Sequence, residues 1–381
     1  MIEEFGVSGR QLFATIDEEP IAAASLAQVH RAVLKDGREV AVKIIYPCLR
    51  RELASDFAVF KTLGAQIKPG GFDLTWMVKD FEEALAQELN FTKEAENSER
   101  CKEALAHVPG VHVPGVVWEY TRSSVLVTEF VRGMVRLDDE EALKAQGLDR
   151  REVGGIVADV FSEMALCHGY VHGDPHLGNV YARKNEEGRA QLVVLDHGLY
   201  HRVPDELRRD VCRLLLACVE RRRPEITKLG SKLAGPLHRF LPLLLSPWFV
   251  FGGALTLGDL RAAMQGQIPK TVALKDIGQC IESMHSQGGS VLGLLHSLGY
   301  TRGLLKALSY PESLRLKSLA QYATLGLLPE PKEQKKAIAD LHSAPGEIRT
   351  AVSMARAQVS VTVWVVVPAL LLWRLLRPFA L

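Results

Sequence analysis

The sequence predicts an α+β fold of two lobes, a small β-rich lobe followed by a large helical lobe. Alternating, β-branched segments occur between residues 16 and 45 and again between 111 and 130, whereas residues 150–170 and most of the chain after residue 200 have helical patterns. The chain has 381 residues, of which 47% are hydrophobic, so it can fill the core of a two-lobed fold.

The segment that ends at Asn179 carries the most informative motif. Asp174, Asn179 and, behind an apolar strand at 193–195, Asp196 supply the oxygen donors that hold a metal-bound triphosphate. Protein kinases have the same order of catalytic loop, strand and Asp-x-Gly. We therefore predict a protein-kinase-like fold that binds ATP and Mg²⁺. Asp174 is then the catalytic residue that faces the acceptor hydroxyl, and Asn179 and Asp196 are the metal ligands.

The upstream part of such a site is also present. Residues 39–45 alternate as a β-strand, with Lys43 in the position of the lysine that pairs with the α- and β-phosphates. The Asp-Gly step in residues 35–38 predicts a hairpin turn to a preceding strand at 28–33. Alone, Lys43 would be interpreted as an ordinary lysine at a sheet edge.

Small residues occupy the expected position of the phosphate-binding loop, namely Ala22, Ala23, Ala24 and Ser25. Backbone N–H groups can still approach phosphates there, but alanine lacks glycine's easy access to positive φ, so we expect a stiffer loop. An alanine run alone would favour a helix start.

Strands are expected over residues 111–118 and 124–130, and a hinge at residues 128–133, at the end of the second strand. Backbone groups of this segment, at Glu129 and Val131, would hydrogen-bond the adenine ring.

Together these segments resemble the ABC1/UbiB (aarF-domain) family of atypical kinase-like proteins. The matching motifs are the alanine-rich loop at 22–30, the VAVK strand at 40–43, QELNFTKEAEN at 87–97, HGDPHLGN at 172–179 and LDHG at 195–198. The resemblance covers roughly the first 200 residues. It implies a kinase-like fold, ATP as the nucleotide, a link to coenzyme Q or lipid metabolism, and a mitochondrial location.

The resemblance also implies that Glu94 pairs with the strand lysine. Two departures from the family pattern occur. Asn90 stands where the family's Glu-x-Asp motif has its second carboxylate, and no Lys-x-Gly-Gln motif precedes the alanine loop. We therefore expect the small lobe to be N-terminally truncated.

The predicted domains are a small lobe at 1–130, a large lobe at 131–345 and a tail at 346–381. Within the tail, residues 357–373 carry no charge and lie between arginines. A bilayer-spanning helix needs about 17–25 apolar residues, so we expect a C-terminal hydrophobic helix that crosses a membrane once and contacts lipid. The alternative is a buried strand and helix of the large lobe.

The formal net charge of +1 argues against a nucleic-acid partner. The six cysteines form no Cys-x-x-Cys pair and are expected to be reduced and buried. Three functions remain open: an ATP-dependent phosphotransferase or ATPase, a catalytically silent nucleotide-binding module, and a membrane-attached scaffold. The sequence does not identify protein partners or the phosphoryl acceptor.

Overall fold

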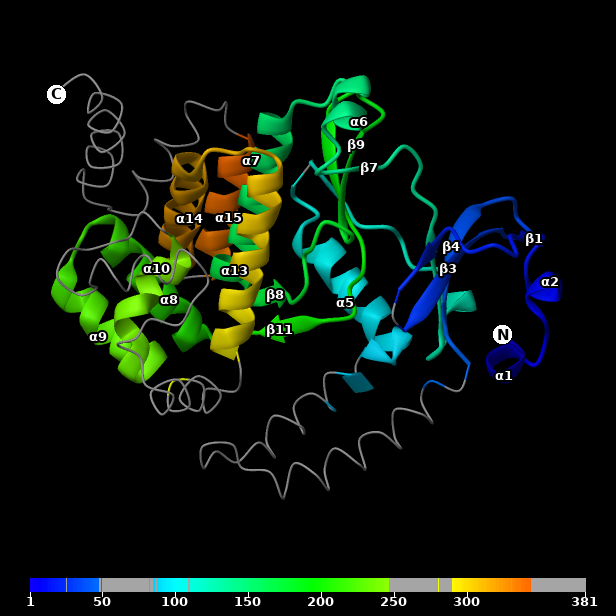
Figure 1. Cartoon of the computed structure of the whole chain (residues 1–381), viewed down its shortest axis with the longest axis horizontal. Coiled ribbons are helices and arrows are strands. Elements are labelled where there is room, and N and C mark those ends of the chain that lie inside the picture. The colour runs from blue at the N-terminus through cyan, green and yellow to red at the C-terminus, as the bar shows by residue number, and fades with distance from the viewer. Residues whose placement is uncertain are drawn as a thin grey trace. The chain divides into compact units, whose positions relative to one another are not determined.

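The computed structural model describes residues 1–24, 26–47, 49, 82, 85, 86, 88–108, 110–246, 280, 290–329 and 331–343. The chain divides into two compact units. The first unit comprises residues 1–106, 111–136 and 179–200; the second comprises 107–110, 137–178 and the described residues from 201 onward. Figure 1 shows their elements, and each unit is described by itself.

An antiparallel sheet forms the start of the first unit. Its strands run in the order β1 (Thr15–Ile16), β3 (Ala27–Val33), β4 (Glu39–Ile45) and β6 (Val125–Glu129), and β2 (Ala22–Ala23) pairs with β3. Gly37 has φ +89° in the turn between β3 and β4, so the predicted hairpin is confirmed. Val40 and Val42 of β4 are buried and their neighbours are less so, as in half-buried strands; the alternation ends before Ile45, which is also buried. Two short helices precede the sheet, α1 (Ile2–Phe5) and α2 (Gly9–Leu12).

A second sheet of the first unit carries the motif that ends in Asp196. Its order is β5 (Val111–His112), β10 (Ala190–Val194), β9 (Val180–Lys184) and β7 (Val135–Arg136). The strand expected over 111–118 is wrong in extent. Its ladder with β10 ends at His112, Val116 forms an isolated bridge to Thr128 of β6, and the 3₁₀ helix η2 (Trp118–Tyr120) occupies its end. Pro114, which lacks a backbone donor, lies two residues after His112, between these two pairings.

One helix, α5 (Phe91–Ala104), completes the described part of the first unit. Asn90 caps it, since its side-chain oxygen accepts a hydrogen bond from the Thr92 backbone N–H at 3.2 Å. Phe91 and Ala95 are buried on the same face, as their spacing predicts. The residue that departs from the family's second carboxylate is therefore a helix cap.

The second unit is mainly helical. Its elements up to residue 202 are α6 (Glu140–Ala145), α7 (Arg150–Glu163), the π-helical turn η3 (Met164–His168), β8 (Tyr170–His172) and β11 (Tyr200–Arg202), which starts at the last residue of the first unit. The later elements are α8 (Asp205–Val219), α9 (Arg223–Ala234), η4 (Gly235–Phe240), α10 (Leu241–Leu245), α13 (Ser290–Ala307), α14 (Glu312–Gly326) and α15 (Pro331–Ser343).

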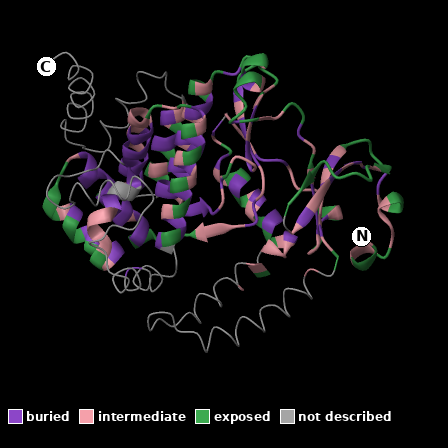
Figure 2. Ribbon diagram, in the orientation of Figure 1, coloured by how far each residue is buried: buried purple, intermediate pink, exposed green. Residues whose placement is uncertain are grey.

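Helices α7, α8, α13, α14 and α15 surround the core of this unit. Helix α14 contacts α7, α8 and α15, and α13 contacts α7. Figure 2 shows in purple that these helices carry many buried residues. Tyr322 of α14 is fully enclosed, with 0% exposed. The cysteines at 101, 167, 212, 218 and 280 are free and buried, as predicted.

Several predictions fall outside the described residues. These are the place of Ser25 in the phosphate-binding loop, the burial of Cys48, and the tail from 346 to 381 with its uncharged run. Among the helices that the structure describes, none is both long and apolar enough to cross a membrane.

Candidate nucleotide site

Lys43 lies at the centre of a charge cluster in the first unit. Its ammonium Nζ is 2.8 and 2.9 Å from the two carboxylate oxygens of Glu94 and 3.3 Å from Oδ2 of Asp196. The Phe91 ring lies beside it, with Nζ 5.1 Å from the ring centroid. The two carboxylates hold the ammonium charged and keep the pKa of Lys43 above its ordinary value, although burial opposes this.

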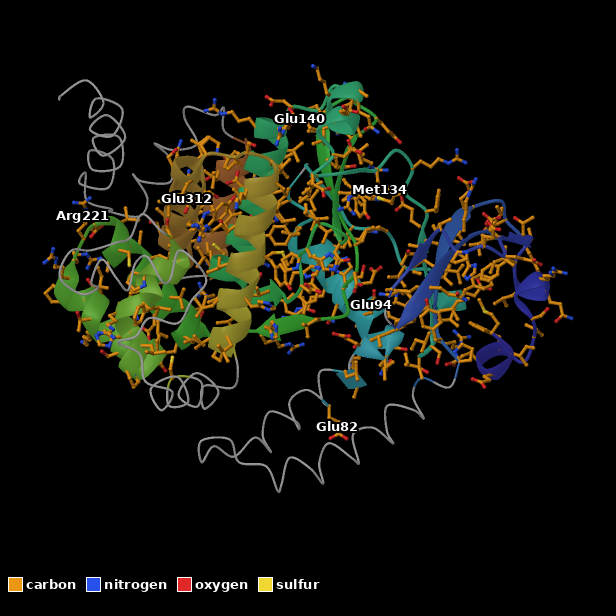
Figure 3. The ribbon with its side chains drawn as sticks, in the orientation of Figure 1. Glu82, Glu94, Met134, Glu140, Arg221 and Glu312 are labelled. Carbon is orange, nitrogen blue, oxygen red and sulfur yellow. The ribbon has the colours of Figure 1, made fainter. Side chains whose placement is uncertain are left out.

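Helix α5 brings Glu94 to the sheet. Glu94 lies in the first turn of the helix (Figure 3), where a carboxylate interacts favourably with the helix dipole. Only 3% of the residue is exposed. Burial raises the pKa of Glu94 to about 7; the Lys43 ammonium opposes this shift and the Asp196 carboxylate adds to it. The pairing of Glu94 with the strand lysine therefore has the predicted geometry.

Asp196 and Asn179 flank the hairpin of β9 and β10. Asn179 directly precedes β9, and its backbone carbonyl accepts a hydrogen bond from the Leu195 N–H at 2.7 Å. Asp196 follows two residues after β10 and has a positive φ of 53°. Its Oδ1 accepts a hydrogen bond from the Gly198 N–H at 3.2 Å, and a Cβ at Gly198 would come within 3.2 Å of this oxygen. The glycine therefore leaves room for the carboxylate.

His197 fixes this turn. Its carbonyl accepts a hydrogen bond from Asn97 Nδ2 of α5 at 2.9 Å, and its ring nitrogens lie 2.9 Å from the Tyr200 hydroxyl and 3.2 Å from the Val194 carbonyl. The sequence analysis missed Asn97 and Tyr200. Their signal was their position within or next to matched motifs, since Asn97 ends QELNFTKEAEN and Tyr200 follows LDHG by two residues.

The alanine segment forms part of a hairpin and not a helix start. Ala22 and Ala23 pair with Val29 and Gln28 of β3, and the Ala24 N–H donates to the Ala27 carbonyl at 2.8 Å. Ala22, Ala23 and Ala24 are exposed, so their backbone is accessible to a ligand. Their role in phosphate binding stays a prediction.

Contacts with residues 112 and 115 hold Glu129, the first of the two predicted hinge residues. The Glu129 N–H donates to the Gly115 carbonyl at 2.8 Å, and its carboxylate lies 3.1 Å from His112 Nε2. Val131 is buried, with 5% exposed. Because the Glu129 amide is already engaged, contacts to adenine are left to its carbonyl and to Val131, and they stay predictions.

Asp174 belongs to the second unit. Its backbone N–H donates to Nδ1 of His172 at 3.2 Å, and His172 is buried against Phe161. Tyr300 of α13 forms a hydrogen bond with the Asp174 side chain, and burial together with this carboxylate raises the pKa of the tyrosine. His176 Nε2 lies 3.8 Å from Asp174 Oδ2. The sequence analysis missed Tyr300, which lies far along the chain in a segment with no motif.

The structure thus brings Lys43, Glu94 and Asp196 into direct contact and positions Asn179 at the start of the same hairpin. The catalytic candidate Asp174 belongs to the second unit, where it forms hydrogen bonds with His172 and Tyr300.

Comparisons with known proteins agree with these motifs. Residues 1–230 match the ABC1 atypical kinase-like domain. AarF domain-containing protein kinase 1 of Gallus gallus is 32% identical over 314 residues, which are 80% of this chain and 60% of that protein. The probable serine/threonine-protein kinase abkD of Dictyostelium discoideum is 30% identical over 336 residues, which are 86% of this chain and 47% of that protein. The chain therefore spans about half the length of these relatives.

A solved structure supports the fold. The complex of Rv3197 with erythromycin from Mycobacterium tuberculosis matches with a TM-score of 0.53 and 19% identity, covering 84% of this chain and 82% of that one. Together with the domain match, this likeness confirms the predicted kinase-like fold, with a β-sheet lobe and a helical region.

Proposed function

Because the chain belongs to the family of ABC1 atypical kinase-like domains, we propose that it binds Mg-ATP and transfers or hydrolyses the γ-phosphoryl group. The observation that carries this proposal is the contact of Lys43 with both Glu94 and Asp196. A lysine held by a helix glutamate is oriented toward the α- and β-phosphates, and the aspartate beside it is positioned for a metal.

The residues present fit Mg²⁺. Asp196 offers a carboxylate whose side chain is 40% exposed and therefore accessible to a ligand, and Asn179 offers an amide oxygen. Oxygen donors in small number are what Mg²⁺ takes from a protein when phosphates complete its coordination. When bound, the ion would neutralise charge on the phosphates.

In this proposal the chain's own groups have separate tasks. Lys43 binds phosphate oxygens and Glu94 orients it. Asp174, held by the His172 ring and the Tyr300 hydroxyl, accepts a proton from a hydroxyl group or from water. Whether the acceptor is a protein, a lipid or water decides between a kinase-like transferase and an ATPase.

Two aspartate variants test the proposal. Asp196→Asn should remove most Mg-dependent ATP binding, whereas Asp174→Asn should abolish phosphate release and leave ATP binding nearly intact. Binding is measured by titration of purified protein with Mg-ATP, and turnover by phosphate release with and without lipid vesicles. Asp36→Asn, in the exposed β3–β4 turn, is the matched control and should change neither. Unchanged binding in Asp196→Asn would refute the metal assignment.

A catalytically silent nucleotide-binding module is the second candidate. It is favoured by the alanine hairpin and by Asn90, which caps α5 where the family motif has a carboxylate. ATP binding without phosphate release, in parent and Asp174→Asn alike, would support it.

We further propose a link to coenzyme Q or lipid metabolism, a mitochondrial location, and membrane attachment through residues 357–373. These proposals rest on the family resemblance and on the uncharged run. Deletion of residues 357–381 should release the protein from membranes and leave Mg-ATP binding unchanged. A deleted form that stays in the alkali-resistant membrane fraction would refute the attachment.

A further inference from the structure

Three histidines surround one buried glutamate in the second unit. Glu163, the last residue of α7, is completely buried. Its Oε1 lies 2.8 Å from Nε2 of His107 and 2.8 Å from Nε2 of His168, and its Oε2 lies 3.0 Å from Nε2 of His342. A carboxylate without any exposure is unfavourable unless a cation or several donors compensate it.

The backbone brings these side chains together from distant segments. The π-helical turn η3 follows Glu163 directly and positions His168, five residues on, beside the same carboxylate. His107 lies in the short segment 107–110 of this unit, and His342 in the last turn of α15. Figure 1 shows α7, α14 and α15 side by side, which explains how residues 163 and 342 meet.

The three histidines are not equivalent. Nε2 of His168 makes a hydrogen bond of good geometry with Oε1 of Glu163. Nε2 of His107 is as close to this oxygen, but its direction does not form a hydrogen bond, and the atom is shielded from solvent without a hydrogen-bonding partner among the described residues.

We propose that His107, Glu163 and His342 bind one divalent transition-metal ion, and that the ion is Zn²⁺. Their ligand atoms all lie within 4.8 Å of one another. Two imidazoles and one carboxylate form a ligand set that zinc accepts in proteins, with a water molecule in the fourth position. Mg²⁺ and Ca²⁺ prefer oxygen ligands alone, so the two nitrogens favour a transition metal.

Ring geometry supports this assignment. The ring centroids of His107 and His342 are 5.4 Å apart, and the rings are inclined by 62°. With Zn–N bonds of about 2.0–2.1 Å in a tetrahedral site, two ligating imidazoles have centroids roughly 5 Å apart. The separation of the two rings therefore matches that of two imidazoles that bind one ion.

One neighbour has the place of an outer-shell group. His168 would keep its hydrogen bond to the ligating carboxylate. Such a partner orients a metal ligand. His168 also lines a cavity of about 360 Å³.

Binding of the ion would release protons and compensate the buried charge. The ligating nitrogens must be neutral and unprotonated, so the ion displaces their protons to solvent. A divalent cation then compensates the Glu163 carboxylate. The ion would join the segment 107–110 and helix α15 to the end of α7, and it would thereby stabilise the second unit. None of Lys43, Asp196 and Asp174 takes part, so the inference is independent of the proposed nucleotide chemistry.

The test measures zinc on the full chain. Purified protein is stripped with a chelator, reloaded at buffered micromolar free Zn²⁺ and assayed for metal content and melting temperature. We expect about one zinc per chain and a raised melting temperature in the parent. The double variant His107→Gln/His342→Gln should lose both effects. Co²⁺ loading should give visible absorption bands of a tetrahedral site in the parent and none in the double variant.

Two further variants sharpen the result. His168→Gln removes an outer-shell partner and should weaken zinc binding about 10- to 100-fold without abolishing it. His112→Gln removes a single histidine–glutamate contact of the same kind, to Glu129 in the first unit, and should leave zinc binding unchanged. If the double variant does not fold, as judged by circular dichroism, the single variant His107→Gln, at a half-buried position, replaces it.

Three outcomes would overturn the inference. They are a parent that holds no zinc at micromolar free Zn²⁺, a double or replacement variant that retains it, and equal weakening by His112→Gln. Because metal content is measured without nucleotide, failure here leaves the proposed ATP site untouched.

Discussion

The pKa values of two buried glutamates of this chain are shifted in opposite directions. Glu94, with 3% of the residue exposed, pairs with Lys43, and burial raises its pKa to about 7. Glu163, with 0% exposed, is surrounded by histidines, and its pKa is held well below the ordinary value although burial alone would raise it. Exposure therefore does not decide the charge state.

The difference lies in the neighbours. Glu94 shares one ammonium with a second carboxylate, Asp196, so two negative charges compete for one positive charge. Glu163 has three imidazole nitrogens near its two oxygens. At Glu163 the surrounding imidazole nitrogens outweigh the cost of desolvation, whereas at Glu94 the shared ammonium does not. A buried carboxylate is therefore stabilised as an anion when the polar groups around it outnumber the carboxylates that compete for them.

The largest effect is expected from Lys43→Ala. Removing one partner of a buried pair leaves uncompensated charge and costs about 3–5 kcal/mol of unfolding free energy. The loss should be smaller at pH 5.5 than at pH 8, because Glu94 can then take up a proton. Urea denaturation at both pH values measures it. Lys35→Ala, at the exposed hairpin turn, is the control, and a pH-independent loss would contradict the account.

Glu163→Gln should have the next largest effect, about 1.5–3 kcal/mol, because it removes a charged acceptor of buried hydrogen bonds. In metal-free protein the lowered pKa of Glu163 stabilises the fold above the unfolded pKa near 4.5, and this contribution is lost as the pH falls through the folded pKa. The stability difference between parent and variant should therefore shrink below pH 4.5. Denaturation curves from pH 3.5 to 7 test this; a difference that grows on acidification would disprove it.

Glu94→Gln should give a slope of the opposite sign. A raised carboxyl pKa stabilises the fold below pH 4.5, and that contribution is lost as the pH rises through about 7. Between these values the stability of the parent relative to the variant should fall by an amount on the order of 1–3 kcal/mol. Parallel curves for parent and variant would show that Glu94 is ionised throughout.

The smallest effect is expected from Cys218→Ala, which removes a buried group without charge. Burial alone raises the pKa of Cys218 to about 12, so the thiol stays protonated from pH 5 to 8 in both states. The cost should be about 1 kcal/mol and the same at both pH values. A pH-dependent cost would mean that the unfolding measurement reports the titration of groups other than Cys218.

Short sequence patterns predicted the strands, the turn and the site residues whose structure depends on neighbouring residues in the chain. Alternation identified β3 and β4, the Asp-Gly step identified their turn, and motif spacing identified Lys43, Glu94 and Asp196 as neighbours. The strand after residue 111 was overestimated, because its apolar composition does not reveal that the ladder with β10 ends at His112 and that Val116 bridges to β6 instead. Pairing depends on tertiary contacts that a single segment does not contain.

The residues that the sequence analysis missed meet over long separations. Tyr300 and Asp174 lie 126 residues apart, and His342 and Glu163 lie 179 apart, so no spacing rule connects them. The Glu163–His168 contact is local but depends on a π turn, whereas helical periodicity assumes 3.6 residues per turn. The only sequence signal for the Glu163 cluster was that His168 and His342 lie near the ends of helical segments, and this signal is too weak to predict a cluster by itself.

The backbone of Asp196 has a practical consequence for engineering. A non-glycine residue with φ 53° costs roughly 1–3 kcal/mol, and glycine adopts the same conformation without that strain. Replacing the aspartate would also relieve the repulsion that raises the Glu94 pKa. A selection for heat resistance alone would therefore reward the loss of the residue to which we assign the metal, and thermostabilised forms of this chain should be designed with position 196 held constant.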